Sequence, residues 1–414
     1  MSEGFFSSRF VPKPSHLLEI DTMPAGFRLG GMSCGVKHPD SAVLDLGLLA
    51  CDSEGTVSAA RFCDSGVLAA PVVVTRERCD LHAIRAVVAN SGNANAATGE
   101  AGIAQAVQVQ EAAAAALGLS PREVAVASTG VIGVLLPGER IAAALPALTE
   151  RLSPDGLEDF AEAIKTTDAI DKHVQLQVAL PSGSVSLSAA CKGAGMISPR
   201  FATMLCFVQT DAVLSAPSAD ALLGAAVRRS FDRVSVDGQL STNDTAILMA
   251  SGASGVHVEP GSEDEALLGE ALDALALQLA VRMVADGEGA RRIARVHVRG
   301  AGEESVSRVA RSVANSPLIK AALFGGDPNW GRIAQAIGAA LPGTAPLRFD
   351  IAIEGITVAR DGAGVGHDEA SLARAVSGNE ILYEIGLPGE GAEAELFFSD
   401  LSYDYVKINA EYTT

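Results

Sequence analysis

The sequence predicts an α/β or α+β protein, with mixed sheets and helices layered on them. First, short apolar runs typical of strands are interleaved with longer segments of helical periodicity. Second, residues 175–180 and 184–190 alternate in polarity on either side of Pro181–Gly183, which indicates a β-hairpin. Third, 48% of the 414 residues are hydrophobic and 20% are charged, as in a globular protein with a sizeable core. The length allows two or three domains.

The first half of the chain alternates between predicted strands and helices. Residues 1–25 are irregular and contain prolines, which predicts an arm draped over the surface. Strands are predicted at 81–89 and 123–128, each followed by a polar or Gly-rich loop and then a helix. The two helices are predicted over the Ala-rich segment 101–117 and from Pro137 onward, where Pro and Gly mark the start.

The second half begins with a strand that is apolar at every position. Met204–Val208 carries no charge and is flanked by turn-forming residues, so we expect it to be buried on both faces. The clearest amphipathic helix is 263–285, where Leu and Met recur at steps of three and four. Further elements are a helix at 217–234 capped by Ser215 or Ser218, helical stretches at 309–325 and 330–341, a strand at 348–355 and strand-like alternation over 394–414.

Composition excludes several classes of function. The net charge is −19, whereas nucleic-acid binders need basic stripes and anionic membranes attract basic segments. The six cysteines form no CxxC pair, so neither a metal nor a redox motif is predicted. Cys191 and Cys206 lie in apolar strands, where we expect them to act as small buried hydrophobic residues. We expect reduced thiols and a cytoplasmic protein, since no signal peptide or membrane span is evident. We also expect no cofactor.

Two glycine-containing motifs resemble known signatures but lack their context. Gly31–Gly35 (GMSCG) matches the nucleophile-elbow pattern, which needs a strand before it and a helix after it, and neither flank fits. Gly193–Ser198 (GAGMIS) nearly matches a dinucleotide fingerprint, but Pro199 and a strand follow where a helix is required. We therefore interpret the first as a coincidence and the second as a tight turn.

Thr203 stands at the head of the buried strand, directly after Ala202. β-branched residues fit strand starts, and that property alone explains most such positions. The alternative is a nucleophile exposed by cutting the chain before Thr203, because the new α-amino group could then act as its base. Such a nucleophile also needs an oxyanion hole. The segment Ser128–Gly130, at the end of a predicted strand, could supply one or could be an ordinary turn.

These segments together resemble the ornithine acetyltransferases, also called glutamate N-acetyltransferases, of arginine biosynthesis. The likeness runs over nearly the whole chain, in ordered blocks that are more specific than any single motif. The blocks are GFRLGGMSCGVK, VVANSGNANAATGEAG, VASTGVIG, AIKTTDA, KGAGMISPRFATMLCFVQTDA, DGQLSTNDTAILMASG, DGEGARRI, VANSPLIKAALFGGDPNWGRIAQAIG and DLSYDYVKINAEYTT.

The resemblance implies a precursor that cleaves itself between Ala202 and Thr203. It implies an α chain, 1–202, and a β chain, 203–414, with a smaller C-terminal α/β region at roughly 290–414. Thr203 matches the family's nucleophile, and Thr129 and Gly130 match its oxyanion-hole pair. The positions that match its substrate contacts are Thr166, Lys192, Thr203, Glu288, Asn409 and Thr414. Lys192 could face an α-carboxylate and Glu288 the side-chain ammonium of ornithine.

The implied reaction is ping-pong acetyl transfer from N-acetylornithine to glutamate through an acetyl-Thr enzyme that releases ornithine. Some members of the family also accept acetyl-CoA, and nothing in the sequence separates the two kinds. The family further implies an αββα-type sandwich like that of the related N-terminal-nucleophile aminopeptidases, and assembly of αβ pairs into an (αβ)2 or larger oligomer. It implies neither a metal nor a nucleic-acid or membrane partner.

Three departures from the family pattern bear on substrate preference. Gln239 stands where Asp is more usual, Arg291 and Arg292 replace a Thr-Lys pair, and the residues after Asp168 differ.

Two alternative functions remain open. One is an N-terminal-nucleophile amidase or aminopeptidase that uses water as the acceptor, and the other is a non-catalytic protein that binds amino acids.

Overall fold

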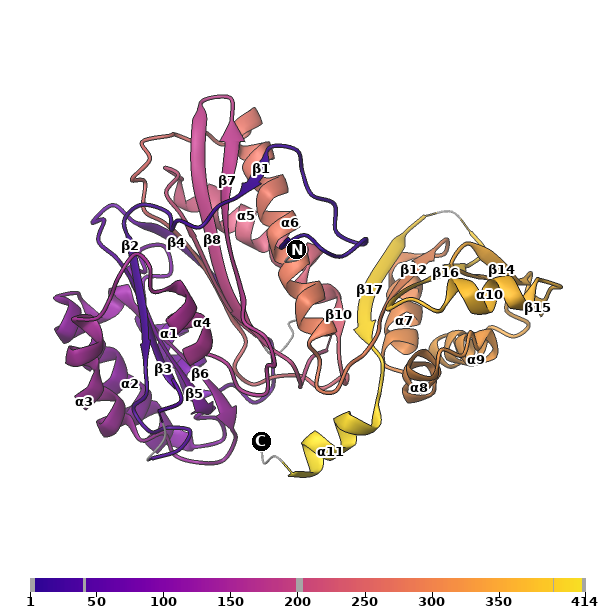
Figure 1. Cartoon of the computed structure of the whole chain (residues 1–414), viewed down its shortest axis with the longest axis horizontal. Coiled ribbons are helices and arrows are strands. Elements are labelled where there is room, and N and C mark those ends of the chain that lie inside the picture. Colours follow the sequence, from indigo (N-terminus) through magenta and orange to yellow (C-terminus); the bar gives the residue numbers. More distant parts are fainter. Residues whose placement is uncertain (1–3, 40–41, 199–203, 390, 412–414) are drawn as a thin grey trace.

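Two β-sheets pack face to face in the larger part of the molecule (Figure 1). The computed structural model describes residues 4–39, 42–198, 204–389 and 391–411. The four-stranded sheet has the order β2 (Phe27–Met32), β3 (Leu46–Cys51), β5 (Ala86–Asn93) and β6 (Val124–Val131). The six-stranded sheet has the order β1 (Leu17–Glu19), β7 (Lys172–Leu180), β8 (Gly183–Lys192), β9 (Leu205–Thr210), β11 (Thr245–Ala250) and β4 (Val57–Phe62).

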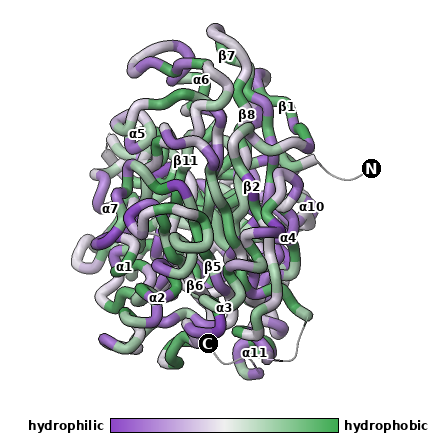
Figure 2. Tube along the Cα trace, turned by 90° about the vertical axis from the view of Figure 1, so that its left-hand side faces the viewer, coloured by the Kyte–Doolittle hydropathy of each residue, from purple (hydrophilic) through white to green (hydrophobic). Residues whose placement is uncertain are grey.

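Helices cover the outer face of each sheet, which makes a four-layered αββα sandwich as predicted. Between the sheets lies an apolar core in which the rings of Phe160 and Phe207 meet edge to face at 5.6 Å. Figure 2 shows this hydrophobic interior along the strands. The four-stranded sheet is covered by α1 (Ala70–Arg78), α2 (Gly99–Leu117) and α3 (Gly138–Thr149), the six-stranded sheet by α5 (Ala216–Arg229) and α6 (Glu263–Ala285), and α4 (Leu157–Ala163) packs beside β2 and β3.

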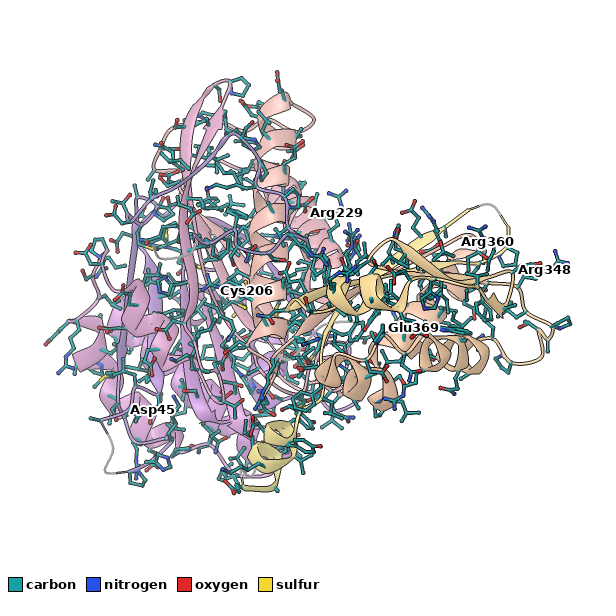
Figure 3. The ribbon with its side chains drawn as sticks, turned by 45° about the vertical axis from the view of Figure 1, so that its right-hand side comes forward. Asp45, Cys206, Arg229, Arg348, Arg360 and Glu369 are labelled. Carbon is teal, nitrogen blue, oxygen red and sulfur yellow. The ribbon has the colours of Figure 1, made fainter. Side chains whose placement is uncertain are left out.

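A third sheet with its own core forms the remainder of the molecule, on the right of Figure 1. It has the order β10 (Val234–Ser235), β17 (Glu393–Ser399), β12 (Ile293–Arg299), β16 (Glu380–Gly386), β13 (Asp350–Ile353), β14 (Ile356–Arg360) and β15 (Ala363–Gly364). Arg348 and Arg360 mark its far edge in Figure 3. Its helices are α7 (Glu303–Ala314), α8 (Pro317–Gly325), α9 (Trp330–Ala340) and α10 (Glu369–Ala375), and the chain continues into α11 (Tyr403–Glu411).

Several sequence predictions are confirmed by the structure. The helix predicted at 263–285 is α6, with its periodic Leu and Met side chains buried. Every residue of β9 is buried, because helices or sheet cover both of its faces. The β7–β8 pair is the predicted hairpin, and α5 is capped by the Ser215 hydroxyl, which accepts the amide N–H of Ser218 at 3.2 Å. All six cysteines are free, and Cys191 and Cys206 are buried (Figure 3).

Three predictions about the second half are wrong. The helix predicted at 217–234 extends too far, because α5 ends at Arg229 and β10 begins at Val234. The helical stretch 309–325 is two helices, because Pro317 begins α8 and the chain turns before it. The strand-like alternation over 394–414 describes β17 but not α11, which starts where the Ser402 hydroxyl accepts the amide N–H groups of Asp404 and Tyr405. No residue of α11 is buried.

The GMSCG segment shows why a motif needs its context. Asp45 is fully buried, and its carboxylate accepts the amide N–H groups of Cys34 at 2.7 Å, Val36 at 2.6 Å and Lys37 at 3.0 Å. A loop therefore follows β2, held by a carboxylate that is labelled in Figure 3, and no helix begins there. A strand, β2, does precede the segment, so the prediction that neither flank fits is wrong for the first flank. The rejection of the nucleophile elbow rests on the missing helix alone.

Candidate active site

A cavity of about 220 Å³ lies where the ends of β6 and β8 meet the turn after α6 and the helix α11. Six of the site residues that the sequence suggested line it together: Thr129, Gly130, Thr166, Lys192, Glu288 and Asn409. The other lining residues are Thr167, Gly195, Met196, Asp237, Gln239 and Tyr405. Ala202, Thr203 and Thr414 lie outside the described residues.

Thr129 and Gly130 occupy the end of β6, which pairs in parallel with β5. Gly130 has a φ of +131°, a conformation that side chains disfavour. A Cβ atom on Gly130 would also lie 2.3 Å from the carbonyl carbon of Gly92 on β5. The glycine is therefore required by the close approach of two backbones at the strand ends, which also leaves its own backbone open to the cavity.

Lys192 ends β8 and is only 2% exposed. Its ammonium group donates to the hydroxyl oxygens of Thr129 at 3.1 Å and Thr166 at 2.9 Å. Burial lowers the pKa of Lys192. Lys192 is therefore a buried cation at the base of the cavity, joined to two of the other suggested site residues, and not a solvated charge.

Glu288 lies in the DGEG turn after α6, where its amide N–H donates to the carbonyl of Ala194 at 2.9 Å. Its carboxylate accepts the side-chain amide of Asn409 at 2.6 Å. The carboxyl carbon of Glu288 would lie 2.6 Å from a Cβ atom on Gly195. The second glycine of the KGAG segment thus makes room for the carboxylate that Asn409 of α11 contacts.

Asp237 is a lining residue that the sequence did not single out. Its carboxylate accepts the amide N–H of Met196 at 2.7 Å and of Ile197 at 3.0 Å, and the Tyr405 hydroxyl lies 3.5 Å away. It therefore fixes the loop that leads toward residue 199. The signal was present in the VDGQ turn, where Gln239 drew attention but its neighbour did not.

The start of β9 is anchored at Met204. Its amide N–H donates to the Asp244 carboxylate at 3.0 Å, and its carbonyl accepts the amide N–H of Thr245 at 3.0 Å. Asp244 is fully buried, and burial raises the pKa of its carboxyl group well above the usual range. The residue that directly follows Thr203 is thus held in place by two hydrogen bonds, one of them to a buried carboxyl group.

The described residues contain no cluster of three or more His, Cys, Asp or Glu side chains arranged to hold a metal ion. Within the same residues, no helix is both long and apolar enough to cross a membrane.

Known proteins resemble this chain over nearly its whole length. The model of the ArgJ family matches residues 28–414. An arginine biosynthesis bifunctional protein ArgJ from Symbiobacterium thermophilum is 42% identical over 395 residues, which cover 95% of this chain and 98% of that protein. A relative of the same name from Rhodopirellula baltica is 40% identical over 410 residues, covering 97% of this chain and 98% of that protein.

A solved structure also matches. The crystal structure of an ornithine acetyltransferase from Mycobacterium tuberculosis, complexed with ornithine, is 35% identical, covers 46% of this chain and 98% of the solved chain, and has a TM-score of 0.40.

Proposed function

The chain belongs to the ArgJ family, and on that premise we propose that it transfers an acetyl group from N-acetylornithine to glutamate in arginine biosynthesis. One observation carries the proposal. Side chains from β6, β8, the loop after α4, the turn after α6 and α11, which are far apart in the sequence, converge on one small cavity. Its 220 Å³ is below the roughly 300 Å³ at which pockets for drug-sized ligands begin. That size suits a single amino acid.

The first step of the proposal is self-cleavage. The Thr203 hydroxyl attacks the carbonyl carbon of Ala202, the C–N bond breaks, and the chain passes to an ester on the threonine oxygen. Water hydrolyses this ester, which leaves the Ala202 carboxylate and a free Thr203 amine. The products are an α chain, 1–202, and a β chain, 203–414, with the region from roughly 290 as a smaller α/β part of the β chain.

Acetyl transfer then proceeds in two halves. The Thr203 hydroxyl attacks the acetyl carbonyl of N-acetylornithine while the Thr203 amine takes its proton. The C–N bond breaks, the α-nitrogen takes the proton, and ornithine leaves an acetyl ester on Thr203. The α-amine of glutamate attacks this ester, which gives N-acetylglutamate and restores the hydroxyl. Thr129 and Gly130 hold the oxyanion in both halves.

The geometry of the cavity supports roles for the other residues. Lys192 provides a buried cation for a substrate carboxylate, next to Thr166. Glu288, oriented by Asn409, provides a carboxylate for the side-chain ammonium of ornithine. Thr414 completes the substrate contacts in the proposal.

The proposed enzyme works without a metal or cofactor, and it acts in the cytoplasm as an assembly of αβ pairs. Its acetyl donor is N-acetylornithine, and acetyl-CoA is a second donor to be tested.

The intact mass of the denatured protein tests the proposal, with Thr203→Ala and Thr203→Ser beside the wild type. We expect two fragments that break between Ala202 and Thr203 in the wild type, one full-length species for Thr203→Ala, and slower cleavage for Thr203→Ser, which keeps a hydroxyl. A folded wild-type protein that stays whole would contradict the mechanism and favour a non-catalytic protein that binds amino acids.

The acceptor is tested separately with cleaved protein and N-acetylornithine. We expect N-acetylglutamate to form only when glutamate is present. Release of free acetate at the same rate without glutamate would identify an amidase. Acetyl-CoA in place of acetylornithine decides whether the enzyme has the second activity.

A further inference from the structure

A buried charge network lies behind the cavity wall, and the proposed reaction does not use it. The side chains of Asp168 and Lys172 are fully buried. One oxygen of Asp168 accepts the Lys172 ammonium group at 2.7 Å and the amide N–H of Gly193 at 2.7 Å, and the other accepts the amide N–H of Thr166 at 3.1 Å. Lys172 also contacts Asp286 at 2.5 Å. The Asp168 carboxylate is thus fixed on three sides.

The same carboxylate accepts the amide N–H of the residue that follows Lys192 and of Thr166, whose hydroxyl group accepts the Lys192 ammonium group. The hydrogen-bond partners of Lys192 itself are the neutral hydroxyl groups of Thr129 and Thr166. Burial lowers the pKa of Lys192, and the carboxylate of Asp168 is the main electrostatic influence that opposes this. Lys172 has the same sign as Lys192 and lowers its pKa further, whereas Asp244 raises that pKa by less than Asp168 does. Burial raises the pKa of Asp244 itself, which weakens it as a counter-charge. Cys191 precedes Lys192 on β8, and its thiol contacts the sulfur atom of Met283 on the opposite face of the strand. The other carboxylates that line the cavity are Asp237 and Glu288.

Asp168 itself is ionised. Burial alone would raise the pKa of its carboxyl group, but the ammonium groups of Lys192 and Lys172 outweigh burial and hold that pKa below the usual range. A buried ammonium group needs a counter-charge, and in this environment Asp168 is the group that supplies it.

We propose that Asp168 is a positioning residue that keeps Lys192 protonated and so keeps a cation at the base of the cavity for the substrate. Lys172 and Asp286 hold the carboxylate in place, and Asp168 itself reaches the substrate only through Lys192 and Thr166. The inference rests on the proposed acetyl transfer, because it assigns a role within that reaction.

The pH dependence of kcat/KM for acetyl transfer separates an electrostatic role from a structural one. Asp168→Asn keeps the shape and a carbonyl oxygen but removes the charge. We expect the alkaline limb of the profile to move down by about 1 to 3 pH units, the range of shifts caused by a close opposite charge. The matched control is Asp171→Asn, on the same segment, whose carboxylate is 40% exposed and pairs with Lys165 at 2.6 Å. The control should leave the limb in place.

Titration of [13Cε]lysine signals by NMR gives a readout that does not depend on activity. The chain has seven lysines, and the signal lost in Lys192→Met identifies the one of interest. We expect the midpoint for Lys192 to fall in Asp168→Asn by the same amount as the alkaline limb. An unmoved midpoint, or a uniform fall in kcat/KM at every pH, would overturn the inference.

Failure of the proposed function is distinguishable from failure of this inference. A wild-type enzyme without acetyl transfer would contradict the function, and the lysine titration would still decide the role of Asp168. Asp168→Asn leaves Lys172 paired with Asp286. Should this variant still not fold, Asp168→Asn/Lys172→Met/Asp286→Asn removes all three charges of the network together. In this variant the titration midpoint of Lys192 should fall by less, because the like charge of Lys172 is lost as well. An unshifted midpoint in this variant would overturn the inference.

Discussion

The two sides of the cavity are built in opposite ways. The β6–β8 side rests on strand ends, where Lys192 is almost inaccessible and the Asp168–Lys172 pair behind it is fully buried. The α11 side is a helix without a buried residue, in which Tyr403 is 84% exposed. This helix reaches the cavity through the Asn409–Glu288 bond and the longer contact of Tyr405 with Asp237. The buried side supplies charges held by several partners each, whereas the helix contributes two polar contacts from an exposed surface.

The largest expected effect is on the buried side, in the stability of Lys172→Met. This change leaves Asp286 buried without its ammonium partner, and loss of one member of a buried ion pair costs about 3 to 5 kcal/mol. Urea unfolding measures the free energy. The control is Arg78→Met, which breaks the half-exposed pair with Glu111 at a cost of about 0 to 1 kcal/mol. Equal losses in the two variants would remove the distinction between buried and exposed charges.

The attachment of α11 to the end of β17 is tested by the pH dependence of stability, through Lys320. Its ammonium group donates to the carbonyl of Ser399 at 2.7 Å, at the end of β17 just before α11, and burial lowers its pKa to about 7. An unfolded lysine has a pKa of about 10.4, so between these values the unfolded chain binds a proton that the folded chain does not. Stability should therefore fall as the pH falls from about 10 to 7.

Melting temperatures across that pH range check the expectation. Lys320→Met should reduce the slope of the free energy of unfolding against pH by up to about 1.4 kcal/mol per pH unit. Lys407→Met, on the exposed surface of α11, should leave it unchanged. Identical pH dependences in wild type and Lys320→Met would show that this lysine stays charged when buried.

A smaller effect is expected for Asn409→Ala on the helical side. The side-chain amide of Asn409 donates to the Glu288 carboxylate at 2.6 Å, and a bond to a charged group contributes roughly 1.5 to 3 kcal/mol. We expect KM for N-acetylornithine to rise at least about tenfold with kcat nearly unchanged, because Glu288 would be less well oriented. Lys407→Ala, on the same helix, is the control. A fall in kcat at constant KM would place Asn409 in the chemistry.

The elements that the sequence predicted best are those whose pattern depends only on local burial. The run Met204–Val208 is apolar at every position because the strand is buried on both faces, and β9 matches it closely. The helix 263–285 is apolar at every third or fourth position because one face is buried, and α6 matches it. The segment after Asp400 was predicted as a strand because its helix has no buried face. Its sequence therefore lacks the apolar residues at every third or fourth position that mark a packed helix. A single hydroxyl, that of Ser402, starts this helix, and such a cap is easily missed.

The site was predictable only through the family blocks. Lys192 and Glu288 would have been taken for solvated charges from their own neighbourhoods, yet both line the cavity. Asp168 and Asp237 were missed because their roles consist of contacts with distant segments, such as Asp168 with Gly193 and Asp237 with Met196. Contacts of this kind leave no spacing or composition in a single sequence.

Tyr405→Phe is expected to have the smallest effect and tests the comparison most directly. Burial raises the pKa of the Tyr405 hydroxyl to about 12, so it is a neutral donor, and its 3.5 Å distance from the Asp237 carboxylate is at the limit of a hydrogen bond. We expect kcat/KM to change by no more than about threefold, because a hydrogen bond at this distance is weak even to a carboxylate. Asp237→Asn, which disturbs the carboxylate that receives Met196 and Ile197, should cost more. A loss of tenfold or more in Tyr405→Phe would mean that the hydroxyl contacts the substrate, and α11 would then take part in the chemistry as the strand ends do.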